Sequence, residues 1–115
     1  MSLVTVTVGD LTFTGILLAD ESSREGPDQD RWMEVRIYRV GDGGYVTEIV
    51  GRSTRHGEVD LTNAVYHDDA DTIPDALMRR SGHVAPYMTI TAQDALAEAA
   101  RKDSRVMRTA EQYLR

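Results

Sequence analysis

The chain has 115 residues, of which 41% are hydrophobic and 28% charged, and its net charge at pH 7 is −6. These proportions are typical of one globular domain, residues 1–115, and not of a disordered chain. The chain has no cysteine, which excludes disulfides, thiol catalysis and thiolate metal sites. The acidic balance disfavours nucleic-acid binding, which requires clustered cations. No run is long and apolar enough for a signal peptide or a membrane span, so we expect a cytoplasmic protein without membrane contact.

The first twenty residues predict a β-hairpin. Residues 3–8 alternate valine with threonine, which is typical of a strand. Gly9 and Asp10 then separate this run from a second apolar run at residues 11–19, and such a pair favours a tight turn. Residues 20–30 are polar and lack periodicity, so we expect a solvated loop there.

Residues 31–52 are the most strongly patterned stretch, because two alternating runs flank the sequence Gly-Asp-Gly-Gly. We expect a long β-hairpin at the centre of a sheet. On its first arm Met33, Val35 and Ile37 share the face that is predicted to meet the core. The opposite face is expected to carry amphipathic aromatic and charged side chains, namely Trp32, Glu34, Arg36 and Tyr38 from the first arm and Tyr45 and Thr47 from the second.

The second half of the chain is expected to be partly helical. Residues 59–66 predict one strand or two short ones. A short helix is expected to begin near Thr72, which can cap it, with Pro74 in its first turn and Asp75 at the capping-box position. Residues 83–90 contain Pro86 and are expected to form a connector.

Apolar residues recur at helical spacing from Thr91 to Leu114 and predict a long C-terminal helix. Uninterrupted, it would be roughly 36 Å long, against ~30 Å for a nine-residue strand. Asp103 breaks the apolar stripe, so either the helix bends there or its basic end projects beyond the sheet. The stripe also offers a surface for a homodimer through the C-terminal helix. The expected fold is α+β: a mostly antiparallel sheet of four to five strands, a short helix and a long C-terminal helix packed on one face.

The exposed face of the central hairpin supports the leading functional hypothesis. Trp32, Arg36, Tyr38 and Tyr45 are of the residue types most enriched in protein-binding hot spots. We therefore expect a non-catalytic protein-interaction or regulatory module with a protein partner. Cross-strand neutralisation of Arg36 by neighbouring glutamates is the structural alternative.

A second hypothesis is an accessory protein that binds single-stranded nucleic acid. Aromatic side chains interleaved with arginine can stack on bases, although the net charge disfavours this function. The basic residues of the C-terminal segment would add phosphate contacts; they are Arg101, Lys102, Arg105, Arg108 and Arg115.

A third hypothesis is a metal-dependent enzyme centred on His67, Asp68, Asp69 and Asp71. Carboxylates beside a histidine can bind a divalent cation. Acidic residues are equally favoured just before a helix, where the N-terminal dipole stabilises them. No nucleophile elbow, phosphate-binding loop or His-Glu zinc motif is present. We therefore expect no catalytic residue, no metal and no cofactor.

The central hairpin carries one motif with a family resemblance. Its residues are Arg31-Trp32, Glu34 and Ile37-Tyr38-Arg39, followed by Gly44-Tyr45-Val46 and Val50-Gly51-Arg52-Ser53. This pattern resembles small uncharacterised bacterial proteins, some of them linked to plasmids or phages, and covers about a fifth of the chain. The resemblance implies an accessory or mobile-element protein. Those proteins have no established activity, so no functional residue is transferred from them.

Overall fold

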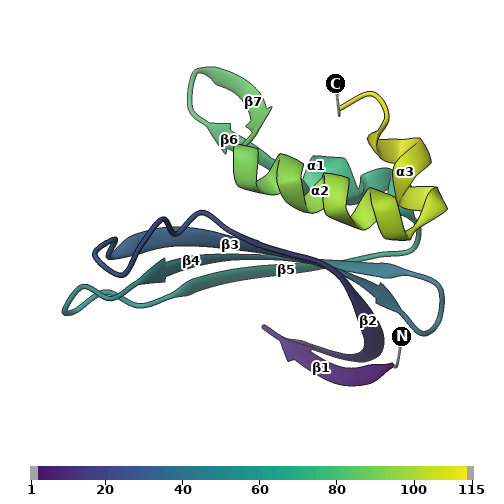
Figure 1. Ribbon diagram of the computed structural model, residues 1–115, viewed down its shortest axis with the longest axis horizontal. Coiled ribbons are helices and arrows are strands. Elements are labelled where there is room, and N and C mark those ends of the chain that lie inside the picture. The colour runs from purple at the N-terminus through teal and green to yellow at the C-terminus, as the bar shows by residue number, and fades with distance from the viewer. Residues whose placement is uncertain (1–2, 114–115) are drawn as a thin grey trace.

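The computed structural model describes residues 3–113, except for the side chain of Ser81, and it has an α+β fold (Figure 1). The strands of the large sheet are β1 (Val4–Val8), β2 (Leu11–Ser22), β3 (Arg31–Val40), β4 (Tyr45–Ser53) and β5 (Leu61–His67). They are all antiparallel and lie in the order β1-β2-β3-β4-β5. The predicted α+β class and antiparallel sheet are therefore confirmed.

The second half of the chain adds a small hairpin and the helices. The hairpin consists of β6 (Met78–Ser81) and β7 (Val84–Met88). The helical segments are the 3₁₀ turn η1 (Ala70–Thr72) and the helices α1 (Ile73–Leu77), α2 (Ile90–Lys102) and α3 (Ser104–Ala110). Asp69 caps η1 by accepting a hydrogen bond from the backbone of Asp71, whereas Thr72 makes no capping bond. In residues 3–113 no helix has the length and apolar character needed to cross a bilayer.

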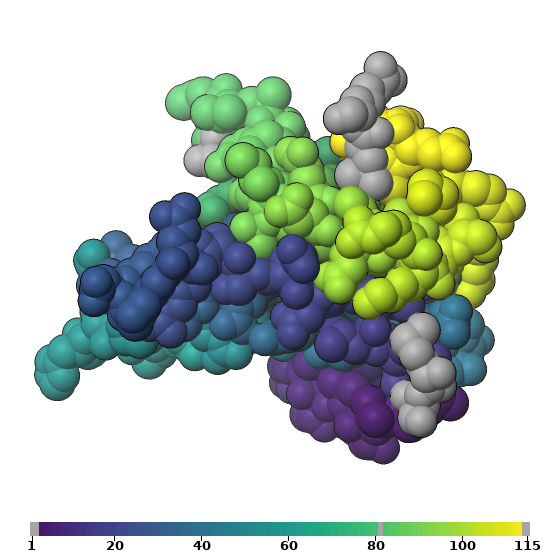
Figure 2. Space-filling model, viewed as in Figure 1, coloured from purple at the N-terminus to yellow at the C-terminus, as the bar shows by residue number. Residues whose placement is uncertain are grey.

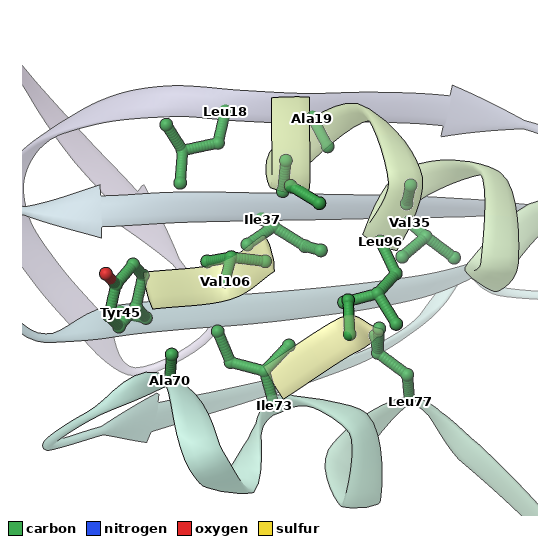
Figure 3. Close-up of a cluster of buried hydrophobic side chains, with 14 of the residues drawn as sticks. Leu18, Ala19, Val35, Ile37, Tyr45, Ala70, Ile73, Leu77, Leu96 and Val106 are labelled. Atoms are coloured by element: carbon green, nitrogen blue, oxygen red, sulfur yellow. The ribbon is translucent and has the colours of Figure 1, made fainter. Parts of the chain in front are cut away.

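The main core lies between the large sheet and the helices (Figure 3). Val35 and Ile37 of β3 are fully buried there, as the alternation of the first hairpin arm predicts. Ile73 of α1, Leu96 of α2 and Val106 of α3 pack into the same cluster. The helices are short and contribute mainly small or aliphatic side chains, so this shared cluster is what holds them against the sheet.

The register of the central hairpin corrects the predicted division of its faces. Residues directly opposite each other in a sheet share a face, and the pairs here are Ile37 with Thr47 and Arg39 with Tyr45. Tyr45 therefore points to the helices and is fully buried, as is Thr47. The expectation that these two residues share a face with Trp32 is wrong, because the pairing places Val46 opposite Tyr38.

A second, smaller core explains why Tyr38 is buried as well. The sheet curls so that β1 and the start of β2 lie beneath its other face (Figure 1). Val8 and Phe13 thereby pack against Tyr38 and Val46, and the Phe13 and Tyr38 rings meet edge-on at 5.3 Å between centroids. Gly15 allows this curl, since a Cβ atom there would lie 2.6 Å from the carbonyl oxygen of Arg39.

The predicted long C-terminal helix is two helices that meet at Asp103. This residue is extended (φ −144°, ψ 117°), and its carboxylate caps α3 by accepting hydrogen bonds from the backbone of Arg105 and Val106. Of the two alternatives left by the sequence, the bend is therefore the correct one. The apolar stripe, including Leu96 and Ala110, is buried in the chain's own core. Met107 of the same stripe is 40% exposed, and the homodimer stays a prediction.

Candidate functional site

The four residues predicted to bind a partner do not form one exposed surface. Tyr45 is fully buried and Tyr38 is only 7% exposed. Trp32 and Arg36 remain partly exposed, and the alternation of β3 puts them on the face of Tyr38, opposite Ile37 and the helices. The structure therefore brings together two of the four, in a network of polar contacts.

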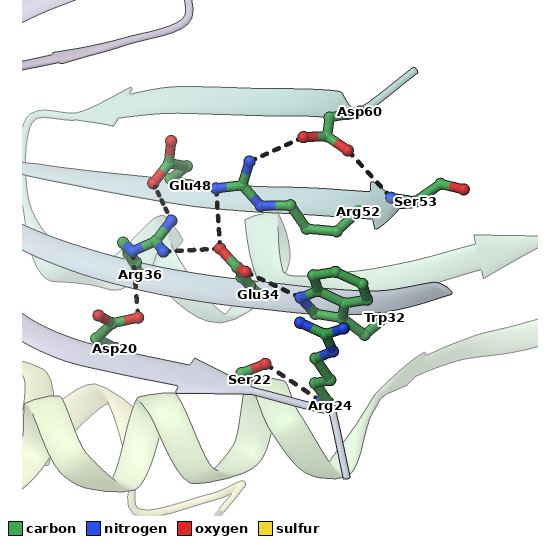
Figure 4. A network of polar contacts seen from close by, with 10 residues as sticks. All are labelled: Asp20, Ser22, Arg24, Trp32, Glu34, Arg36, Glu48, Arg52, Ser53 and Asp60. Atoms are coloured by element: carbon green, nitrogen blue, oxygen red, sulfur yellow. Dashed lines mark hydrogen bonds and ion pairs between the residues drawn. The ribbon is translucent and has the colours of Figure 1, made fainter. Parts of the chain in front are cut away.

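Arg36 lies at the centre of this network (Figure 4). Its guanidinium group lies 3.1 Å from Asp20, 2.7 Å from Glu34 and 3.1 Å from Glu48. The positions follow from the register, because Asp20 and Glu48 are the direct cross-strand partners of Arg36 on β2 and β4. Arg52 extends the network by bridging Glu34 and Asp60, at 3.1 and 2.8 Å.

The charged groups of the network stabilise one another's ionised forms, as the pKa shifts of Glu34 and Arg36 indicate. Burial raises the pKa of the Glu34 carboxyl, but hydrogen bonds from Arg52, Trp32 and Arg36 outweigh it and hold that pKa at about 2. Burial acts to lower the pKa of Arg36, and its bonds to Glu34 and Glu48 raise it by more. Arg36 is thus a fixed cation among three carboxylates, an arrangement that repels phosphate.

Trp32 is held in one orientation by two contacts. Its indole N–H donates a 2.9 Å hydrogen bond to Glu34, and the guanidinium of Arg24 stacks over the ring at 4.0 Å from the centroid. Ser22 accepts a hydrogen bond from the backbone of Arg24, at 3.2 Å. The indole is therefore ordered before any partner arrives, which lowers the entropic cost of binding.

Trp32 also lines a groove of about 590 Å³ at the end of the sheet where β3 begins and β4 ends. Apolar side chains supply much of the lining, namely Met33, Ile49, Val59, Leu61 and Met78. Gly51 lies among them without a side chain, and the ion pair of Arg31 with Glu58 stands at the rim. Figure 2 shows the β6–β7 hairpin, in green, standing above the blue and teal strand ends that contribute most of these residues. We call this surface the apolar groove.

The apolar groove is the feature that the sequence analysis missed. Val59 is 75% exposed and Leu61 72% exposed, although both are apolar. The only local signal was their alternation with Glu58 and Asp60. The other lining residues come from β3, β4 and the β6–β7 hairpin, so only the fold brings them together.

The histidine of the predicted metal cluster is engaged elsewhere. His67 is 4% exposed, and its Nε2 and Nδ1 atoms lie 3.0 Å and 2.6 Å from the hydroxyl oxygens of Thr47 and Thr72. Asp68 and Asp69 are exposed to solvent beyond the end of the strand. Among residues 3–113, no three potential metal ligands converge on one point.

The predicted nucleic-acid contacts lie on opposite sides of the sheet. By the alternation of β3, Trp32 and Arg36 face away from the helices, whereas the basic residues Arg101, Lys102, Arg105 and Arg108 are on α2 and α3. Arg105 stacks on the ring of Tyr45, at 5.1 Å, and donates to the carbonyl of Gly43. Arg115 lies outside the described residues.

No protein-family model, curated protein or solved structure matches this chain. The resemblance of the central hairpin to small bacterial proteins therefore stays a prediction.

Proposed function

We propose that this protein is a non-catalytic module that binds another protein through the apolar groove. The observation that carries the proposal is the exposure of Val59 and Leu61, at 75% and 72%, in a groove that Met33, Ile49 and Met78 also line. Large apolar side chains gathered at one exposed concave site are typical of interaction surfaces.

The composition of the groove also favours a protein partner. Protein interfaces combine an apolar centre, often with tryptophan, and a rim of arginine and other polar groups. Here Met33 and Ile49 provide apolar lining, and Arg31, Arg52 and Arg79 stand around it. The ion pairs of Arg31 with Glu58 and of Arg52 with Asp60 neutralise much of this charge. The groove therefore offers a partner apolar contacts and the hydrogen-bond donors of its arginine side chains, without a large net positive charge.

The test compares groove variants with a matched control. Leu61→Asp and Val59→Asp place a charge on the apolar groove, and both positions are so exposed that the fold should tolerate the change. Val84→Asp is the control, because Val84 is 61% exposed on β7 and does not line the groove.

The tagged 115-residue chain and the three variants are used to capture partners from a lysate of the source organism, and each captured protein is then purified and titrated. We expect a partner that binds the wild type and Val84→Asp alike and loses at least tenfold in affinity for the groove variants. Equal affinity for all four proteins would refute the proposal.

A further inference from the structure

The strand β5 forms an open edge of the large sheet. In residues 3–113 its only strand partner is β4, so the backbone groups along its outer side pair with no second strand, while on one face Ala64 packs on the small core with Val8. Leu61–His67 includes no charged residue and no proline. Leu61, Val65 and Tyr66 are 72%, 36% and 42% exposed. Natural proteins commonly block such edges with charge or proline, and β5 has neither.

We propose that β5 accepts an extended segment of a partner protein as a sixth, antiparallel strand, and that this segment carries basic residues near its amino end. The proposal rests on the proposed protein-binding function and names the kind of segment that is bound. Antiparallel addition matches every other pairing in the sheet. A seven-residue strand offers about 24 Å of edge for this pairing.

The edge and the apolar groove are continuous through one residue. Leu61 is the first residue of β5 and also lines the groove. Its cross-strand partner on β4 is Gly51, which leaves space beside it. Side chains of an added strand would lie about 5 Å from those of β5 on the same face. An apolar side chain opposite Leu61 would therefore enter the groove while the backbone pairs along β5.

The charges at the two ends of β5 determine the polarity of the segment. Before the strand, Asp60 and Glu58 are paired with Arg52 and Arg31. Directly after it, Asp68 and Asp69 are exposed, and no arginine or lysine in residues 3–113 forms an ion pair with either. The amino end of an antiparallel partner lies against this second end. Basic residues there would meet the carboxylate of Asp68 and that of Asp69, which also caps η1.

A second copy of the chain fits this edge less well. Antiparallel pairing of two β5 strands centred on Ala64 would place Asp68 of one copy against Asp60 of the other. Like charges directly opposite each other destabilise a sheet, and each chain carries a net charge of −6. The charges thus favour a basic segment from another protein over self-association.

The first experiment selects binders from a phage-displayed library of random twelve-residue peptides on the 115-residue chain. We expect enriched sequences that alternate apolar and polar residues and carry arginine or lysine near the amino end. The best peptide is then made in two forms, N-methylated on its odd or on its even residues. Only one form should lose binding, because one set of N–H groups faces β5. Equal binding by both forms, or no enriched sequence, would refute strand addition.

The second experiment tests the charge polarity with variants. Asp68→Lys should weaken the selected peptide at least fivefold, and 0.5 M salt should reduce the difference. Asp94→Lys makes the same charge change at an exposed position on α2, which packs against β2 and β3 and not β5, and should leave affinity unchanged. Equal affinity for both variants, or a dimer by sedimentation that Asp68→Lys strengthens, would overturn the proposal.

These results separate the two proposals. If Leu61→Asp abolishes partner capture while both N-methylated forms bind equally, the groove binds protein but β5 does not add a strand. If Leu61→Asp leaves partner affinity unchanged, the proposed function itself fails.

Discussion

Tyr45 and Asp103 form a buried hydrogen bond between the start of β4 and the junction of α2 with α3. The phenolic oxygen lies 3.0 and 2.9 Å from the two carboxylate oxygens. The same carboxylate accepts the backbone N–H groups that begin α3, and Arg39 lies 3.6 Å from it. Burial and Asp103 together raise the pKa of Tyr45 to about 12, so the hydroxyl stays a donor at any physiological pH.

Removing this hydroxyl tests how much the contact stabilises the fold. Tyr45→Phe keeps the ring in the core but leaves a buried carboxylate without one of its donors. We expect the free energy of unfolding to fall by about 1–3 kcal/mol. Tyr87→Phe is the control, because Tyr87 is 44% exposed. Urea unfolding followed by circular dichroism measures both, and equal stability of the two variants would contradict the assigned role.

The faces of the central hairpin show how far the sequence could predict this fold. Val35 and Ile37 alternate with polar residues on β3, and that alternation correctly identified the core side. On β4 the alternation of buried and exposed residues is lost next to the turn, because Tyr45 and Val46 are both buried. Tyr45 lies under the helices, and Val46 lies against β1 and β2. A strand that is covered on both faces shows no alternation of apolar and polar residues, so its two faces cannot be told apart from the sequence.

The candidate site was less predictable because it depends on long-range contacts. The pairing of Arg36 with Glu34 and Glu48 is the structural alternative that the sequence offers, because the three residues belong to the two arms of one predicted hairpin. Its third partner, Asp20, could not be foreseen without the register of β2. In the apolar groove Leu61 lies close to residues of other strands and of the second sheet. No local sequence pattern predicts that these residues come together.

The burial of His67 makes stability depend on pH. Burial lowers the pKa of its imidazole below 6.5, and the opposing effect of Asp69 is smaller. As pH falls below 6.5, the unfolded chain therefore binds a proton before the folded protein does, and stability is lost until pH reaches the folded-state pKa. The expected slope is at most about 1.4 kcal/mol per pH unit.

Urea unfolding at pH 7.5, 6.5 and 5.5 measures this slope. The wild type should lose more stability across the range than His67→Gln, whose side chain does not titrate. His56→Gln, at an exposed turn position, should keep the wild-type slope. A slope that is the same in His67→Gln and the wild type would contradict the prediction.

Replacing Arg36 tests whether the polar network is structural. Arg36→Met keeps much of the side-chain volume but leaves Asp20, Glu34 and Glu48 without their shared cation. We expect a loss of about 1–3 kcal/mol, less than for a fully buried pair, since the Arg36 side chain is 22% exposed. Arg55→Met is the control, because its ion pair with Asp30 is nearly half exposed on both sides. Equal unfolding midpoints for the two variants would show that the network contributes no more than a surface ion pair.

The curl of the sheet predicts a specific sensitivity at Gly15. A Cβ atom there would lie 2.6 Å from the carbonyl oxygen of Arg39 and 3.1 Å from the Phe13 ring. The carbonyl belongs to the neighbouring strand and cannot move without breaking the register of β2 with β3. Gly15→Ala should therefore lower the free energy of unfolding by about 1–3 kcal/mol through overpacking.

Gly26→Ala provides the matched control for this substitution. No heavy atom lies within 4 Å of a Cβ atom built at Gly26, and its φ is not positive. We expect Gly26→Ala to be neutral or slightly stabilising, because alanine restricts the unfolded chain. Thermal unfolding of both variants is the measurement. If Gly15→Ala were as stable as Gly26→Ala, β1 and β2 could not be held as closely beneath the sheet as the structure places them.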